Sequence, residues 1–121
     1  MSHILLIDDD EDMLAMTERW LKKAGYEVST ATSGRDAVSF LSDITPELIL
    51  LDYAMPEMDG PAVLRAIRSD ERLRSIPVLY RTGMDDGFME EESGDIHPDG
   101  VIPKSEGKPF LMKAVEDILA K

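Results

Sequence analysis

The stretch LILLDYAMPEMDG, residues 48–60, decides the fold of this chain. Four consecutive aliphatic residues run directly into Asp52, and a Met-Pro pair follows three positions later. This pattern predicts a strand that is buried on both faces and ends in a loop. In an open α/β sheet, ligands bind in the crevice outside the carboxyl ends of the strands. Asp52 is therefore the first candidate for chemistry.

Apolar runs and helical spacings alternate on both sides of this stretch. The expected strands are residues 4–7, 27–31, 48–52, 77–83 and 101–104. Helical spacing of apolar residues predicts helices over residues 11–24, from Gly34 to Ile44, from Gly60 through Ile67, and around 111–119. Five repeats of strand and helix predict an α/β fold, with a doubly wound parallel sheet and helices on both faces.

One segment between the last two strands fits this scheme poorly. Residues 85–94 contain only Phe88 and Met89 as large apolar residues and are interrupted by Gly87. A helix there would have little to bury, so we expect it to be short or mobile. Elsewhere the sequence contains no repeat, linker or low-complexity segment. We expect one domain over residues 1–121, with no output domain attached.

Composition excludes several functional classes. The chain has 25 acidic and 13 basic residues, a net charge of −12, which repels nucleic-acid backbones and anionic membranes. It contains no cysteine, which excludes disulfides, thiolate catalysis and cysteine-based zinc sites. The N-terminal apolar run is too short for a signal peptide or a membrane span. We expect a cytoplasmic protein that neither binds nucleic acid directly nor inserts into membranes.

Polar residues recur where the expected strands end. Because right-handed crossovers make all five parallel strands point the same way, these residues meet at one edge of the sheet. They are Asp8, Asp9, Asp52, Thr82 and Lys104. Three carboxylates without a cation would repel one another, and Mg²⁺ suits such oxygen ligands. The sequence therefore predicts a magnesium site.

This set of groups suits phosphoryl transfer. A carboxylate beside Mg²⁺ can act as the nucleophile toward a phosphoryl group and form an acyl phosphate. A hydroxyl and an ammonium group can then hold the oxygens of the transferred group, because this reaction needs charge neutralisation and positioning. Asp52, Thr82 and Lys104 are the candidates for these three roles.

Four motifs in order carry a resemblance to a known family. They are ILLIDDD at 4–10, DYAMPEMDG at 52–60, PVLYRTG at 77–83, and Lys104. With them the chain resembles a response-regulator receiver domain of bacterial two-component signalling over essentially its whole length. The resemblance implies a flavodoxin-like sheet in the order 2-1-3-4-5. It also implies a phosphoprotein that takes its phosphoryl group from a histidine kinase or a histidine phosphotransfer protein.

The resemblance also assigns roles to individual residues. It implies that Asp52 is the phosphoacceptor and binds Mg²⁺ together with Asp9 and the backbone carbonyl of Ala54, and that Asp8 helps. Thr82 and Lys104 would contact the phosphoryl group. Such a domain catalyses only its own phosphoryl transfer and dephosphorylation. It signals to a downstream protein, unknown here, by a phosphorylation-dependent change in binding.

Three alternatives concern the lysine and the function. Lys108 also precedes a proline, but Lys104 directly follows an aliphatic pair and lies 22 residues after Thr82, the usual interval in the family. The chain departs from the family at Ser105, where a proline is usual.

An aspartyl-phosphate hydrolase would need a second acid two residues after the nucleophile, and Ala54 occupies that position. A receiver-like scaffold that takes no phosphate would lack an acidic or lysine position, and none is missing.

Overall fold

The computed structural model describes residues 2–83 and 97–120 and contains one five-stranded parallel sheet in the order β2-β1-β3-β4-β5. The strands are β1 (His3–Ile7), β2 (Glu27–Ala31), β3 (Leu48–Asp52), β4 (Val78–Thr82) and β5 (Gly100–Pro103). The helices are α1 (Glu11–Lys23), α2 (Gly34–Asp43), α3 (Gly60–Ser69) and α5 (Lys108–Leu119). This architecture confirms the predicted fold class and strand order. The segment 85–94, expected to form a weak helix, lies outside the described residues.

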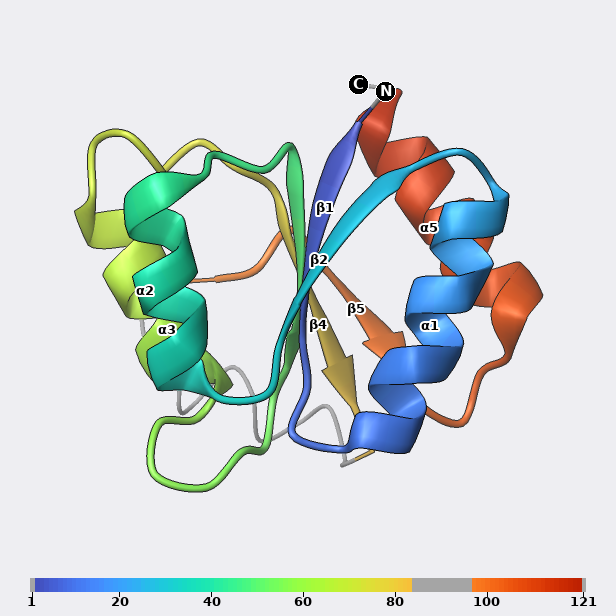
Figure 1. The fold of residues 1–121 in the computed structure, drawn as a ribbon, viewed down its shortest axis with the longest axis horizontal. Coiled ribbons are helices and arrows are strands. Elements are labelled where there is room, and N and C mark those ends of the chain that lie inside the picture. The colour runs from blue at the N-terminus through green and yellow to red at the C-terminus, as the bar shows by residue number, and fades with distance from the viewer. Residues whose placement is uncertain (1, 84–96, 121) are drawn as a thin grey trace.

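Helices cover both faces of the sheet, with α1 and α5 on one side and α2 and α3 on the other (Figure 1). Because successive strand residues point to opposite faces, each strand contributes to two separate apolar cores. Under α1 and α5 the strand residues are Ile4, Leu6, Leu48, Leu50, Leu79 and Ile102. Under α2 and α3 they are Leu5, Ile7, Ala31, Ile49, Leu51, Val78 and Tyr80. Burial of β3 on both faces explains its uninterrupted aliphatic run.

Short polar residues begin three of the helices next to the strand ends. The side chain of Asp10 accepts hydrogen bonds from the backbone amides of Asp12 and Met13 at the start of α1. Ser33 caps α2 and Asp59 caps α3 in the same way, and Pro61 follows in the first turn of α3. Such caps satisfy amides that have no partner inside the helix. They also fix where each strand-to-helix loop ends, and these loops surround the acidic residues.

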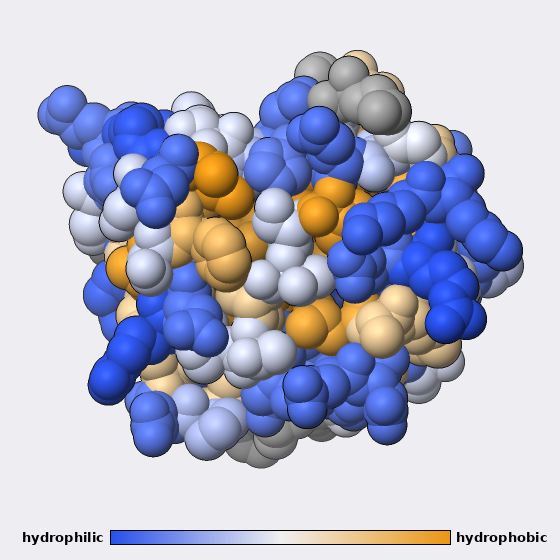
Figure 2. Space-filling model, viewed as in Figure 1, coloured by the Kyte–Doolittle hydropathy of each residue, from blue (hydrophilic) through white to orange (hydrophobic). Residues whose placement is uncertain are grey.

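Figure 2 shows the polar and apolar residues of one face. Hydrophilic residues cover much of this face, and hydrophobic residues show between them in its middle. The largest exposed apolar side chains among the described residues are Met16, Phe40 and Phe110. None of the described helices has the length and hydrophobicity that crossing a bilayer requires.

Candidate functional site

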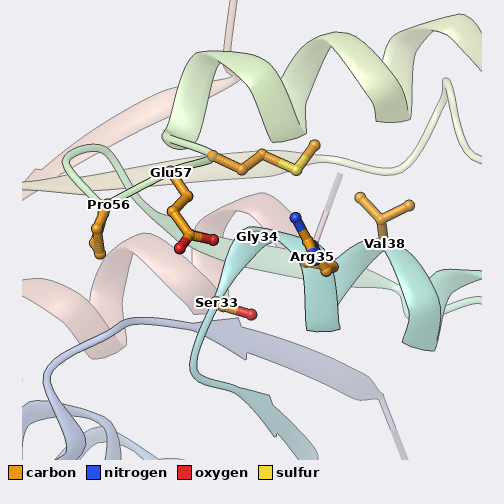
Figure 3. Close-up of a pocket in the computed structure, with 7 residues that line it drawn as sticks. Ser33, Gly34, Arg35, Val38, Pro56 and Glu57 are labelled. Carbon is orange, nitrogen blue, oxygen red and sulfur yellow. The ribbon is translucent and has the colours of Figure 1, made fainter.

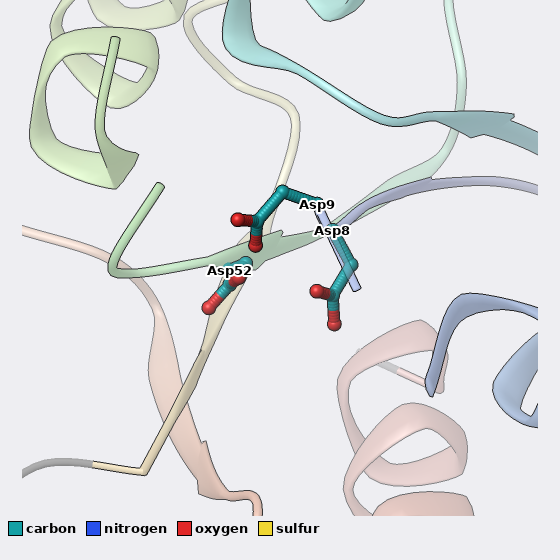
Figure 4. A group of neighbouring side chains, drawn as sticks. All are labelled: Asp8, Asp9 and Asp52. Carbon is teal, nitrogen blue, oxygen red and sulfur yellow. The ribbon is translucent and has the colours of Figure 1, made fainter. Parts of the chain in front are cut away.

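Three carboxylates meet at the carboxyl edge of the sheet. Asp8 and Asp9 follow β1 and Asp52 ends β3, and each offers an oxygen within 4.8 Å of the others (Figure 4). Asp8 and Asp52 are buried, whereas Asp9 is exposed to solvent. The cluster is thus open to a ligand on the side of Asp9 and closed beneath.

Lys104, the residue directly after β5, extends its side chain to this cluster. Its Nζ lies 3.2 Å from Asp52 Oδ1 and 3.4 Å from Asp8 Oδ2. The backbone amide of Lys104 donates to the carbonyl of Thr82 at 2.7 Å, which anchors the lysine to the end of β4. Lys108, the alternative considered from the sequence, is the exposed first residue of α5.

The two remaining predicted residues lie on neighbouring segments. Thr82 is the last residue of β4 and its side chain is buried. Ala54 lies in the loop after β3, two residues beyond Asp52, and is exposed. The structure therefore brings Asp8, Asp9, Asp52 and Lys104 into one cluster, with Thr82 at the end of the adjacent strand.

When no metal is bound, the environment of Asp52 disfavours its ionised form. Burial raises the pKa of Asp52 to about 7, and the charge of Asp8 and the neighbouring Asp9 carboxyl add to the increase. Lys104 opposes it. A carboxyl held at such a pKa gains a great deal from any cation that compensates its charge.

The donor set fits a hard divalent cation. Asp52 Oδ2 is buried and accepts no hydrogen bond from the described residues, although its carboxylate is otherwise paired with Lys104. A buried carboxylate oxygen without a partner is costly, and a cation ligated there would remove the cost. Mg²⁺ commonly uses one or two carboxylates and keeps several waters. Asp9 and Asp52 are the residues that would hold it, with Asp8 alongside.

The loop after β3 returns very close to Asp52. The amide of Gly60 donates to the carbonyl of Tyr53 at 2.8 Å. A Cβ at position 60 would lie 2.8 Å from the carbonyl oxygen of Asp52 and 2.8 Å from the Cα of Tyr53. Both neighbours are backbone atoms and cannot rotate away. Glycine at position 60 is therefore required for α3 to begin beside the end of β3.

This close approach leads to a prediction for Gly60→Ala. We expect the methyl group to force the backbone apart and lower the free energy of unfolding by about 1–3 kcal/mol. The matched control is Gly83→Ala, because a Cβ at Gly83 meets no atom of the described residues within 4 Å. Urea unfolding of both variants would measure the difference. Equal stability of the two variants would contradict this account of the loop.

One charged residue next to the site was not predicted from the sequence. Arg81 precedes Thr82 on β4 and is buried, with 4 % of its surface exposed to solvent. Its Nη1 donates to the hydroxyl of Thr17 on α1 at 2.9 Å. Burial lowers the pKa of Arg81, and the charges of Asp8 and then Asp52 oppose that effect. The available signal was a lone charged residue inside an otherwise apolar strand.

Apart from the acidic cluster, a pocket lies at the start of α2, beside the loop after β3 (Figure 3). Its lining residues are Ser33, Gly34, Arg35, Val38, Pro56, Glu57 and Met58. None of them belongs to the acidic cluster. The pocket is therefore distinct from the candidate site.

Comparison with known sequences gives a consistent result. The family model described as Response regulator receiver domain matches residues 4–116. The transcriptional regulatory protein PrrA of Mycobacterium leprae is 39 % identical over 92 residues, which are 75 % of this chain and 40 % of PrrA. The response regulator PleD of Caulobacter vibrioides is 35 % identical over 121 residues, 98 % of this chain but 24 % of PleD. The chain thus spans less than half the length of either relative.

Solved structures agree over the whole fold. The signal receiver domain of a histidine kinase from Syntrophus aciditrophicus superimposes with a TM-score of 0.91 at 32 % identity, covering 99 % of this chain and 91 % of that one. The chemotaxis protein CheY4 of Vibrio cholerae gives a TM-score of 0.91 at 27 % identity and covers 98 % of each chain.

Proposed function

The chain belongs to the receiver-domain family of response regulators, and from this premise we propose that Asp52 accepts a phosphoryl group from a phosphohistidine of a partner protein. The donor is a histidine kinase or a histidine phosphotransfer protein. The observation that carries the proposal is the pairing of a buried, strand-end carboxylate with Lys104 at 3.2 Å inside a cluster of acids. A structural acid at a strand end would need neither neighbour.

The proposed reaction is a single displacement at phosphorus. An oxygen of ionised Asp52 attacks the phosphorus atom, and the bond from phosphorus to the imidazole nitrogen breaks. The bonding electrons stay on that nitrogen, so the donor leaves as a histidine and Asp52 becomes an acyl phosphate. Mg²⁺, when bound by Asp9, Asp52 and the Ala54 carbonyl, supplies compensation for the charge on the phosphoryl oxygens.

Lys104 and Thr82 would position the transferred group. In the unphosphorylated protein Lys104 is engaged by Asp52 and Asp8, so its ammonium is already oriented toward the reacting carboxylate. After transfer it would bind a phosphoryl oxygen, and the Thr82 hydroxyl would bind another. Both contacts form only with the charged group present, so they favour the transition state and the product.

The signal would be a change in binding to a downstream partner. Addition of a phosphoryl group alters the charge at the edge of the sheet, and it can shift a conformational equilibrium only through differential contacts in two states. We expect this output rather than turnover of an external substrate. The receiver domain would act in the cytoplasm, where a histidine kinase exposes its phosphohistidine.

Mass measurement after reaction with a small phosphodonor tests the proposal directly. Incubation with acetyl phosphate and Mg²⁺ should add one phosphoryl group to the protein, because the domain catalyses its own phosphorylation. The same incubation with a chelator in excess of Mg²⁺ should leave the mass unchanged. Labelling that is equally fast with and without the chelator would contradict a metal-dependent site, and no labelling in either case would contradict the proposed function.

A further inference from the structure

A buried arginine lies beside the acidic cluster on the same face of the sheet. Arg81 of β4 is the register partner of Asp52 in β3, so the two side chains emerge side by side toward α1 and α5. Asp8 directly follows Ile7, the partner of Leu51, and so emerges on that face on the other side of Asp52. Asp52 therefore lies between Asp8, which follows β1, and Arg81 on β4. Among the described residues Arg81 forms no direct ion pair with either carboxylate, so its charge acts on them at longer range.

The guanidinium is held in place from α1. Its Nη1 donates to Thr17 Oγ1 at 2.9 Å, and this hydroxyl donates to the carbonyl of Met13 at 2.9 Å. Arg81 and Thr17 are both buried, and together with Asp8 they line one small cavity. The guanidinium is thus held between the sheet and α1, in a cavity that Asp8 also lines.

Thr17 accounts for only part of the hydrogen-bonding capacity of Arg81. The Nε of Arg81 is buried and has no hydrogen-bond partner among the described residues. A buried guanidinium in such a position is costly unless nearby negative charge compensates it. The charges of Asp8 and Asp52 do so, since both favour the charged form of Arg81. A contact with Thr17 alone would not require a charged side chain.

We propose that Arg81 is a built-in counter-ion of the acidic cluster, which keeps the carboxylates together without a metal and thereby limits the affinity of the site for Mg²⁺. The inference rests on the proposed function, because it concerns the same metal site. Three carboxylates with Lys104 and Arg81 leave one net negative charge, and removal of Arg81 leaves two. Solvent ions screen a buried charge much less than a surface charge. The positive charge of buried Arg81 therefore repels a divalent cation at the acidic cluster and weakens its binding.

Calorimetric titration with MgCl₂ alone would test this role. The neutral variants are Arg81→Gln, which keeps a donor for Thr17, and Arg81→Met, which keeps only the bulk of the side chain. The charge-preserving variant is Arg81→Lys. A titration at about pH 9 keeps Asp52 ionised, since its pKa is about 7. We expect the neutral variants to bind Mg²⁺ on the order of tenfold more tightly than the parent, and Arg81→Lys to remain within about twofold of it.

Several outcomes separate the possible explanations. If the neutral variants fold only when Mg²⁺ is present, the dependence of their stability on MgCl₂ concentration gives their affinity, and an affinity above that of the parent supports the inference. If they lose stability but bind Mg²⁺ with the affinity of the parent, Arg81 is merely structural and the inference fails. If the parent itself does not bind Mg²⁺, the proposed metal site fails, which is a different result. Thr17→Val, which removes the anchor but keeps the charge, should leave the affinity within about twofold of the parent.

Discussion

Replacement of Asp52 with Asn should abolish phosphorylation of the protein by acetyl phosphate. The amide of Asn is uncharged and is not a nucleophile toward phosphorus, whereas its size and shape match those of the carboxyl group. Asp52 combines a buried strand end with contacts to Lys104 and an oxygen that has no hydrogen-bond partner among the described residues. Its loss removes the reacting atom itself, so the expected effect is complete rather than graded.

A matched control keeps the local structure and removes a different acid. Asp59 lies in the same loop and caps α3 by accepting a hydrogen bond from the amide of Ala62 at 3.0 Å. Asn caps helices about as well as Asp, so Asp59→Asn should fold and be labelled like the parent. Intact-protein mass after the same incubation measures both variants. If Asp52→Asn gained a phosphoryl group at the rate of the parent, another residue would be the phosphoacceptor.

Strand positions were predictable because burial on both faces leaves a direct trace in the sequence. The aliphatic run of β3 and the acid that ends it identify the edge of the sheet without knowledge of any contact. The position of Lys104 was also predictable, because a lysine one residue beyond a short apolar strand lies at the same edge of the sheet as Asp52. The loop around Gly60 was predicted as a helix start, but not as a close backbone approach, which depends on the distance between two segments.

The roles of charged neighbours were harder to predict. Asp8 and Asp9 are adjacent and chemically identical, yet one is buried beside Lys104 and the other faces solvent. Arg81 was predicted only as a residue of a strand, because its position next to Asp52 depends on the register of β4 against β3. Register and facing direction are set by packing of the whole sheet, and a linear pattern of residues does not specify them.

The stability of the metal-free protein should fall as the pH rises from about 4 to about 7 because of Asp52. Its pKa lies near 3.8 in an unfolded chain and at about 7 in the folded protein. Between these values the folded state binds more protons than the unfolded state, so each increase in pH favours unfolding. Above the folded pKa the loss is complete and amounts to about 4 kcal/mol. Burial is the main cause of the raised pKa of Asp52, Asp8 and Asp9 add to it, and Lys104 opposes it.

Comparison with Asp52→Asn isolates this contribution from that of the other acids. Asn resembles the protonated carboxyl, so the variant and the parent should be similarly stable near pH 4. Near pH 8 the variant should be more stable by about 3–4 kcal/mol. Urea unfolding over this pH range, with a chelator present, measures the difference. Saturating Mg²⁺ should reduce it, because the ion binds the folded parent through the ionised carboxylate and stabilises that state. A constant difference between the two proteins from pH 4 to pH 8 would show that burial and the neighbouring acids do not destabilise ionised Asp52, and that the metal-free site tolerates its charge.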